Sequence, residues 1–132
     1  MSKVALIRQP AGLGDIMWLQ PIVNHIASRG FEVLYPVCDH YYDRLIGQLE
    51  TDNSKFIRES DLSGKMKDVY LQTQEIIEDD FEYYPFDCIS DPSSESFRPE
   101  YSHVGIMERK YHFYKFLQDD FDISDNDWPN CC

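Results

Sequence analysis

The sequence is short of basic residues and cysteines and has no long hydrophobic run, and each shortage excludes a class of protein. Its 12 Lys and Arg stand against 24 Asp and Glu, which leaves a net charge of −12. Such a surface repels phosphate backbones, so nucleic acid is not an expected partner. No apolar stretch approaches the ~20 residues that a membrane-spanning helix needs. A strand is predicted almost at the first residue, which leaves no room for a signal peptide, and we expect a cytoplasmic protein.

The cysteines and histidines are not spaced as metal ligands. Cys38 and Cys88 lie at the ends of predicted buried strands, Cys131 and Cys132 close the sequence, and no Cys-x-x-Cys pair occurs. The four histidines also lack ligand spacing. These patterns predict reduced, structural cysteines and no metal site.

Hydrophobic residues are sufficient for one folded domain. Of 132 residues, 42% are hydrophobic and 14% are aromatic, which is typical of a single domain with its own core. We expect this domain to span residues 1–118. Residues 119–132 are rich in aspartate and contain no basic residue, so we interpret them as an acidic tail or a truncated interdomain linker.

The stretch Lys3–Val37 has the pattern of a strand, a glycine loop, a helix and a second strand. The apolar run Val4–Ile7 predicts a buried strand, and apolar residues at three- and four-residue spacing predict a helix over Asp15–Arg29 that ends at Gly30. The run Val33–Val37 predicts the second strand. A helical crossover of this length joins neighbouring parallel strands. The fold class is therefore predicted to be α/β, a Rossmann-like three-layer domain with a mainly parallel sheet.

Shorter patterns predict the remaining elements. We expect helices over Asp39–Leu49, with Asp39 as N-cap, and Val104–Leu117; strands over Phe56–Ile57, Asp68–Leu71 and Phe86–Ser90; an amphipathic helix or a covering loop over Gln74–Tyr84; and a surface loop over Ser93–His103.

The glycine loop is the strongest functional signal. In an α/β sheet, the loop after a strand lies at the carboxyl edge, where ligands bind, and the amides that begin the next helix can hold an anion. Met17 stands where a dinucleotide fingerprint has its third glycine, and no Gly-Lys-Ser/Thr occurs, so neither a Rossmann fingerprint nor a P-loop is present. A Gly-x-Gly turn alone is also common for purely structural reasons.

The segment Arg8–Pro21, RQPAGLGDIMWLQP, resembles the N-terminal signature of the heptosyltransferase-like glycosyltransferases, glycosyltransferase family 9. In that family a strand enters Gly-Leu-Gly-Asp and a helix that bears a proline. The residues that match are Gly12, Leu13, Gly14, Asp15 and Pro21. The resemblance is specific over Lys3–Val37 and suggestive over Met107–Trp128.

The resemblance implies one half of a GT-B fold, which has two Rossmann-like halves. The first half holds mainly the acceptor and the second mainly the nucleotide-sugar donor, and these enzymes need neither a metal nor another cofactor. The sequence stops where the second half would start, so we expect the donor-binding domain to be separate.

The resemblance also implies roles for the loop residues. Gly12, Leu13 and Gly14 would bind substrate, and Asp15 would be the general base that accepts the proton of the acceptor hydroxyl. The alternative is that Asp15 only caps the helix, and the two roles are compatible.

Three further residues are candidate substrate ligands. Asp91, after the strand predicted at Phe86–Ser90, is placed to bind sugar hydroxyls, although Asp-Pro also opens ordinary turns. Arg109 and Lys110 would hold a donor phosphate or an acceptor carboxylate, or they belong to a solvated helix face.

The sequence therefore predicts the acceptor-side domain of a glycosyltransferase. It would move a sugar from a nucleotide-sugar donor to a glycan or other hydroxyl acceptor by direct displacement. The alternative is a non-catalytic α/β binding or interaction module derived from such a half-domain.

Overall fold

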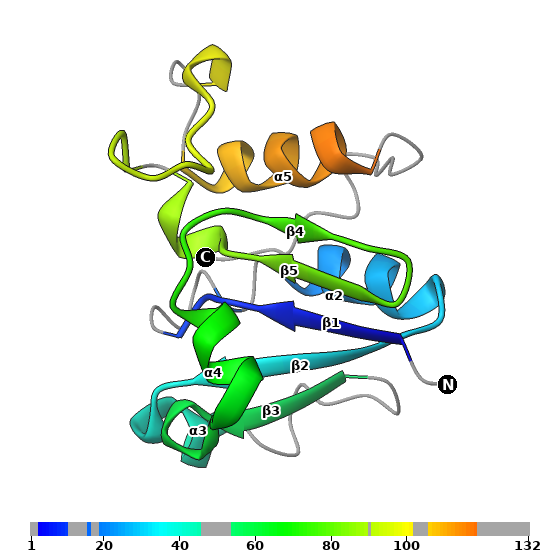
Figure 1. The fold of residues 1–132 in the computed structure, drawn as a ribbon, viewed down its shortest axis with the longest axis vertical. Helices are drawn as coiled ribbons and strands as arrows, with labels where there is room; N and C mark the ends of the chain where they lie inside the picture. Colours follow the sequence, from blue (N-terminus) through cyan, green and yellow to red (C-terminus); the bar gives the residue numbers. More distant parts are fainter. Residues whose placement is uncertain are drawn as a thin grey trace.

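The fold is a five-stranded sheet with helices on both faces (Figure 1). The computed structural model describes residues 3–10, 16, 19–45, 54–89, 91–101 and 106–118. The strand order is β3-β2-β1-β5-β4, and all neighbours are parallel except β4 and β5. The strands are β1 (Lys3–Ile7), β2 (Phe31–Val37), β3 (Ser54–Arg58), β4 (Ile76–Ile77) and β5 (Phe81–Tyr84). The prediction of a mainly parallel α/β domain is confirmed.

The helices form the outer layers. They are α2 (Gln20–Ser28), α3 (Asp39–Leu45), α4 (Gly64–Tyr70) and α5 (Ile106–Leu117), with short 3-10 turns at Glu59–Asp61, Phe86–Cys88 and Pro99–Tyr101. Helices α2 and α5 pack on one face of the sheet and α4 packs on the other. Helix α2 begins at Gln20, with Leu19 as its N-cap, and not at Asp15 as predicted. Asp15 itself, the predicted helix end at Leu49 and the predicted acidic segment 119–132 lie outside the described residues.

The predicted pairing of the first two strands is confirmed. Lys3 of β1 is opposite Phe31 of β2, and the two strands are parallel. Helix α2 ends at Ser28 with Arg29 as its C-cap, and Gly30 is the terminating glycine that was predicted. The amide of Gly30 donates to the carbonyl of Ala27, and its φ of 93° is in the region that favours glycine.

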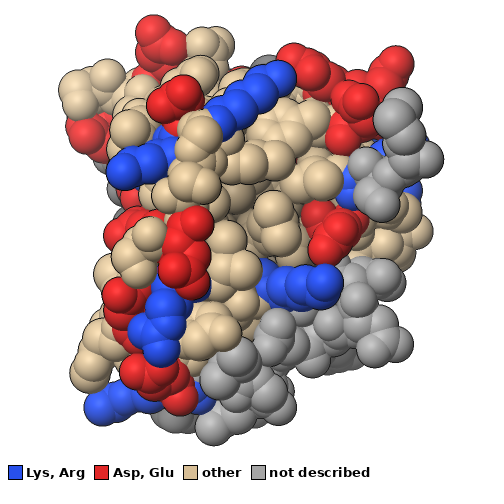
Figure 2. Space-filling model, turned by 60° about the horizontal axis from the view of Figure 1, so that its bottom comes forward, with Lys and Arg blue, Asp and Glu red and all other residues tan. Residues whose placement is uncertain are grey.

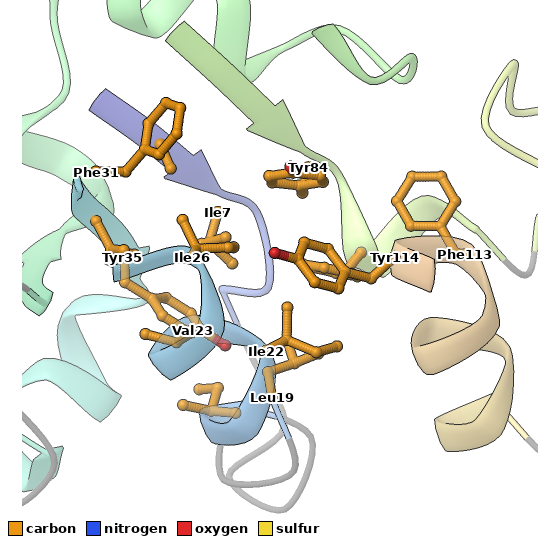
Figure 3. Packing of buried hydrophobic residues seen from close by; sticks show 14 of the residues in the cluster. Ile7, Leu19, Ile22, Val23, Ile26, Phe31, Tyr35, Tyr84, Phe113 and Tyr114 are labelled. Atoms are coloured by element: carbon orange, nitrogen blue, oxygen red, sulfur yellow. The ribbon is translucent and has the colours of Figure 1, made fainter. Parts of the chain in front are cut away.

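One hydrophobic core lies on each side of β1. Ala5 and Ile7 point toward the larger core, which contains the apolar faces of α2 and α5, including Leu19, Val23 and Tyr114 (Figure 3). Leu6 points the other way, into a smaller core under α4. Because alternate side chains of a strand face opposite sides, a strand covered on both faces has a continuous apolar run, as Val4–Ile7 does.

The predictions for the middle of the chain are wrong in three places. Asp68–Leu71 is not a strand, because Asp68 belongs to α4, where Met66, Val69 and Tyr70 form the inward face. Gln74–Tyr84 is neither a helix nor a covering loop, because it forms the β4–β5 hairpin. Phe86–Ser90 is not a strand either, since Pro85 ends β5 and Phe86–Cys88 is a 3-10 turn.

Asp39 does not act as the predicted N-cap. It is the first residue of α3, and the amides of Tyr41 and Tyr42 donate to the carbonyl of Cys38. The carboxylate of Asp39 instead accepts from the hydroxyl of Ser60 at 3.0 Å.

Candidate functional site

The candidate site lies at the carboxyl ends of β1 and β5, where the order of the strands reverses. From β1 the chain passes through α2 to β2 and through α3 to β3, and it then returns through α4 to place β4 and β5 on the opposite side of β1. In open α/β sheets, the crevice outside the strand ends at such a reversal is the usual ligand site. Arg8 and Gln9 follow β1 there, and Asp87 follows β5.

Arg8 and Asp87 form an ion pair that joins the two strand ends. Arg8 Nε lies 3.2 Å from Asp87 Oδ2, and the two side chains are 22% and 24% exposed. The backbone holds both residues: Arg8 N donates to Tyr84 O, and Asp87 N donates to Arg8 O. Burial raises the pKa of Asp87, and the positive charge of Arg8 opposes this effect. A partly accessible carboxylate therefore lies beside a guanidinium at the centre of the sheet edge.

Arg8 also ties helix α4 to this edge. Its Nη1 donates to the carbonyls of Tyr70 at 3.3 Å and Gln72 at 3.2 Å, at the C-terminal end of α4. Tyr83 Oη lies 2.8 and 2.7 Å from the same two oxygens. Carbonyls at a helix end have no partner within the helix, and a cation there is favourable. Arg8 therefore holds two features in place, the end of α4 and the carboxylate of Asp87.

Lys110 reaches the same edge from α5. It is only 2% exposed, and its Nζ donates to Gln9 Oε1 at 2.5 Å. Its charge lowers the pKa of Asp87, in addition to the larger effect of Arg8. The interpretation of Lys110 as part of a solvated helix face is therefore wrong. We name Arg8, Gln9, Asp87 and Lys110 the strand-end cluster.

Asp91 does not directly follow a strand, because β5 ends at Tyr84 and Phe86–Cys88 is a 3-10 turn. Its Oδ1 accepts from the amide and the hydroxyl of Ser93 at 3.0 and 2.8 Å, and these bonds lower its pKa. It is exposed and opens an ordinary turn, as the alternative interpretation has it. The acidic residue at the strand end is Asp87, which the sequence analysis missed because it placed the strand after Pro85 instead of before it.

Of the other predicted site residues, the structure describes Arg109 but not those of the glycine loop. Arg109 is half-buried and lies one position from Lys110, about 100° around the helix. Gly12, Leu13, Gly14 and Asp15 lie outside the described residues. The described ends of their loop are at the sheet edge and in the core: the carbonyl of Pro10 accepts from Cys38 N at 2.9 Å, and Ile16 is fully buried.

The two described cysteines are free thiols. Burial raises the pKa of Cys88 to about 11 and also raises that of Cys38. A thiol with a raised pKa is protonated near neutral pH and is a poor nucleophile.

Among the described residues, no group of three or more His, Cys, Asp and Glu side chains is placed to hold a metal ion. No described helix is long and apolar enough to cross a bilayer.

A second buried polar cluster lies on the face of the sheet that α2 and α5 cover. Glu82 of β5 is 2% exposed and accepts two hydrogen bonds from Arg29, at 2.8 and 2.9 Å. It also accepts from Tyr84 Oη at 2.6 Å and from Gln118 Nε2 at 3.3 Å. Arg29 follows α2 and Gln118 follows α5, so this cluster joins two helix ends to the sheet. We interpret it as structural.

Comparison with protein-family models, with curated proteins and with solved structures found no match.

Proposed function

We propose that this domain is the acceptor-side half of a GT-B glycosyltransferase. It would take part in sugar transfer from a nucleotide-sugar to a glycan or other hydroxyl acceptor by direct displacement, without a metal. The observation that carries the proposal is the sequence Gly-Leu-Gly-Asp at residues 12–15, in the stretch of chain that connects β1, a central strand at the reversal of strand order, to α2. In such a fold, a second Rossmann-like half binds the donor.

The proposed chemistry assigns the proton to Asp15. The acceptor oxygen attacks the anomeric carbon, its proton passes to the Asp15 carboxylate, and the bond from the sugar to the nucleoside diphosphate breaks. The backbone amides around Gly12 and Gly14 would bind a substrate oxygen or anion.

The strand-end cluster supplies the groups that would hold the acceptor. Asp87 accepts hydrogen bonds and Arg8 donates them, so together they suit the neighbouring hydroxyls of a sugar ring. Lys110 adds positive charge beneath this edge and orients Gln9. Within an acidic protein, these two cations favour a sugar that carries a carboxylate or a phosphate.

One observation favours the alternative of a non-catalytic binding module. Arg8 already donates to Tyr70 and Gln72 and pairs with Asp87, and Lys110 already donates to Gln9. Cations engaged in this way support a rigid binding edge as well as a reactive one.

Titration of the ¹⁵N-labelled protein separates the two functions. A panel of sugar acceptors and of ADP-, GDP- and UDP-sugars is added, and amide shifts at Arg8, Gln9 and Asp87 are followed together with release of nucleoside diphosphate. Acceptor-induced shifts with transfer or donor hydrolysis support the enzyme, and glycan binding without donor binding supports the module. If no sugar shifts these amides, both functions are excluded at this edge.

Asp15→Asn tests the proposed base. The amide retains an oxygen that can cap the helix but cannot accept the proton, so we expect near-native stability and turnover lower by ~10²-fold or more when the domain is assayed with its donor-binding half. Asp15→Ala is the control: if Asp15 caps a helix, this change removes the cap as well and should cost about 1 kcal/mol of stability. Unchanged turnover in Asp15→Asn would remove this residue from catalysis.

A further inference from the structure

A groove opens between α4 and the amino-terminal parts of β1 and β5, at the opposite end of these strands from the strand-end cluster. Its volume is about 440 Å³. Val4, Val69, Ile76 and Phe81 form an apolar floor. Lys65 lines it from the α4 side, and Glu78 and Asp80 line it from the turn between β4 and β5. We call this the α4 groove.

The groove is a part of the sheet face that no described helix covers. Figure 1 shows α4 in front of the sheet, toward the carboxyl ends of β1, β2 and β3, and the opposite ends of these strands are open on that side. Mainly parallel sheets normally have helices over the whole of both faces, because both faces are apolar. Val4, Ile76 and Phe81 are only half-buried here. The described residues therefore leave a partly exposed apolar surface beside α4.

An added strand is a poorer fit than a helix. The edge strand β4 would have to supply unpaired backbone groups, but the amide of Glu75, just before β4, already donates to Ser96 Oγ at 3.2 Å. Ser96 Oγ in turn donates to the carbonyl of Thr73 at 2.7 Å. This loop blocks one end of the edge, and β4 itself has only two residues.

The charges around the groove favour a basic occupant. Glu78, Asp79 and Asp80 are consecutive and exposed, and two of them, Glu78 and Asp80, line the groove together with Lys65. Figure 2 shows acidic side chains spread over the visible face among uncharged surface and some basic side chains. A second copy would bring one acidic turn against another, and nucleic acid or an anionic lipid surface would be repelled.

We infer that the α4 groove binds an amphipathic helix of a partner protein, whose apolar stripe lies on the floor and whose Lys or Arg residues face Glu78–Asp80. This inference does not depend on the proposed glycosyltransferase function, because the groove lies at the other end of the strands.

The test uses methyl NMR on the full chain with two helical peptides as probes. Both peptides have one leucine face, and the polar face is Lys in one and Glu in the other. The methyl groups of Val4, Met66, Val69 and Ile76 report on the groove. Those of Ile22, Val23 and Ile26, buried on the opposite face, are the internal reference. We expect the Leu/Lys peptide to shift the groove methyls alone and the Leu/Glu peptide to bind at least about tenfold more weakly.

A matched pair of charge variants tests the acidic wall. Glu78→Lys with Asp80→Lys should weaken binding of the Leu/Lys peptide by about tenfold. Glu95→Lys with Glu100→Lys makes the same change in net charge at exposed residues outside the groove and should change it by less than about threefold. Equal weakening in both variants, shifts on both faces, or no shift would overturn the inference. Shifts of the groove methyls with protein concentration alone would also overturn it, because a second copy would then be the occupant.

Discussion

Substitution of the buried Glu82 should be among the most destabilising changes in the protein. Glu82 is on β5, its two oxygens accept from Arg29 just after α2, and one of them accepts from Tyr84 Oη. Arg29 also lies over the ring of Phe31, with its Cζ 5.0 Å from the ring centroid. Glu82→Ala removes the acceptor of four hydrogen bonds, two from Arg29 and one each from Tyr84 and Gln118, and it also removes the counter-charge of a guanidinium.

The size of the destabilisation depends on how well water can solvate the charge that is left behind. Breaking a buried pair by removing one partner costs about 3–5 kcal/mol, because the other charge is left without compensation. Arg29 is about 25% exposed and can turn toward water, whereas Glu82 is only 2% exposed. We therefore expect Glu82→Ala to lower the free energy of unfolding by about 3 kcal/mol. Arg29→Ala should lower it by about 4–5 kcal/mol, because it leaves the more deeply buried charge without a partner. Glu82→Gln keeps the shape and one acceptor, and should cost only about 1–2 kcal/mol.

Urea unfolding followed by far-UV circular dichroism measures these differences, since a domain of this size is expected to unfold in one step. The double variant Arg29→Ala with Glu82→Ala should cost at least about 1 kcal/mol less than the sum of the single changes, because neither charge is then left without its partner. The exposed pair of Lys55 and Glu32 is the control, and Glu32→Gln should change stability by less than about 0.5 kcal/mol. Additive single changes, or a cost for Glu82→Ala no greater than for the control, would refute the reasoning.

Two other predictions concern the cores. Leu19→Ala, at a fully buried position of the larger core, should destabilise by about 2–5 kcal/mol, and a change below ~0.5 kcal/mol would show that Leu19 does not fill this core. Burial raises the pKa of Tyr83 to about 12 and raises the pKa values of Tyr70 and Tyr84 as well. Tyrosines in the unfolded chain lose their protons near pH 10, while these three keep theirs in the folded protein. The contribution of these tyrosines to the free energy of unfolding is therefore fully present below pH 10 and is lost as the pH rises toward 12. Absorbance of tyrosinate should show late-titrating tyrosines that ionise only on unfolding, and a urea midpoint independent of pH in this range would contradict the prediction.

Local sequence patterns were sufficient for the first part of the fold. Val4–Ile7 is continuously apolar because both sides of β1 are covered, and Gly30 marks the end of α2 because the chain there takes a positive φ. The apolar positions of the helix all enter one core, as their spacing predicts. These signals are strong because each comes from residues close together in the chain.

The middle of the chain depended on contacts that the local pattern does not contain. Glu82 and Lys110 are charged residue types that normally lie on the surface, yet both are buried. The local sequence could not show this, because their partners Arg29 and Gln9 lie 53 and 101 residues away in the chain. Asp87 becomes a site residue only because β5 pairs with β1 and brings it to Arg8. Short amphipathic elements such as α4 and the β4–β5 hairpin have too few residues to show a period. Burial of a charge is possible only where a distant partner neutralises it, so tertiary structure alone decided which charged residues form the interior and the site.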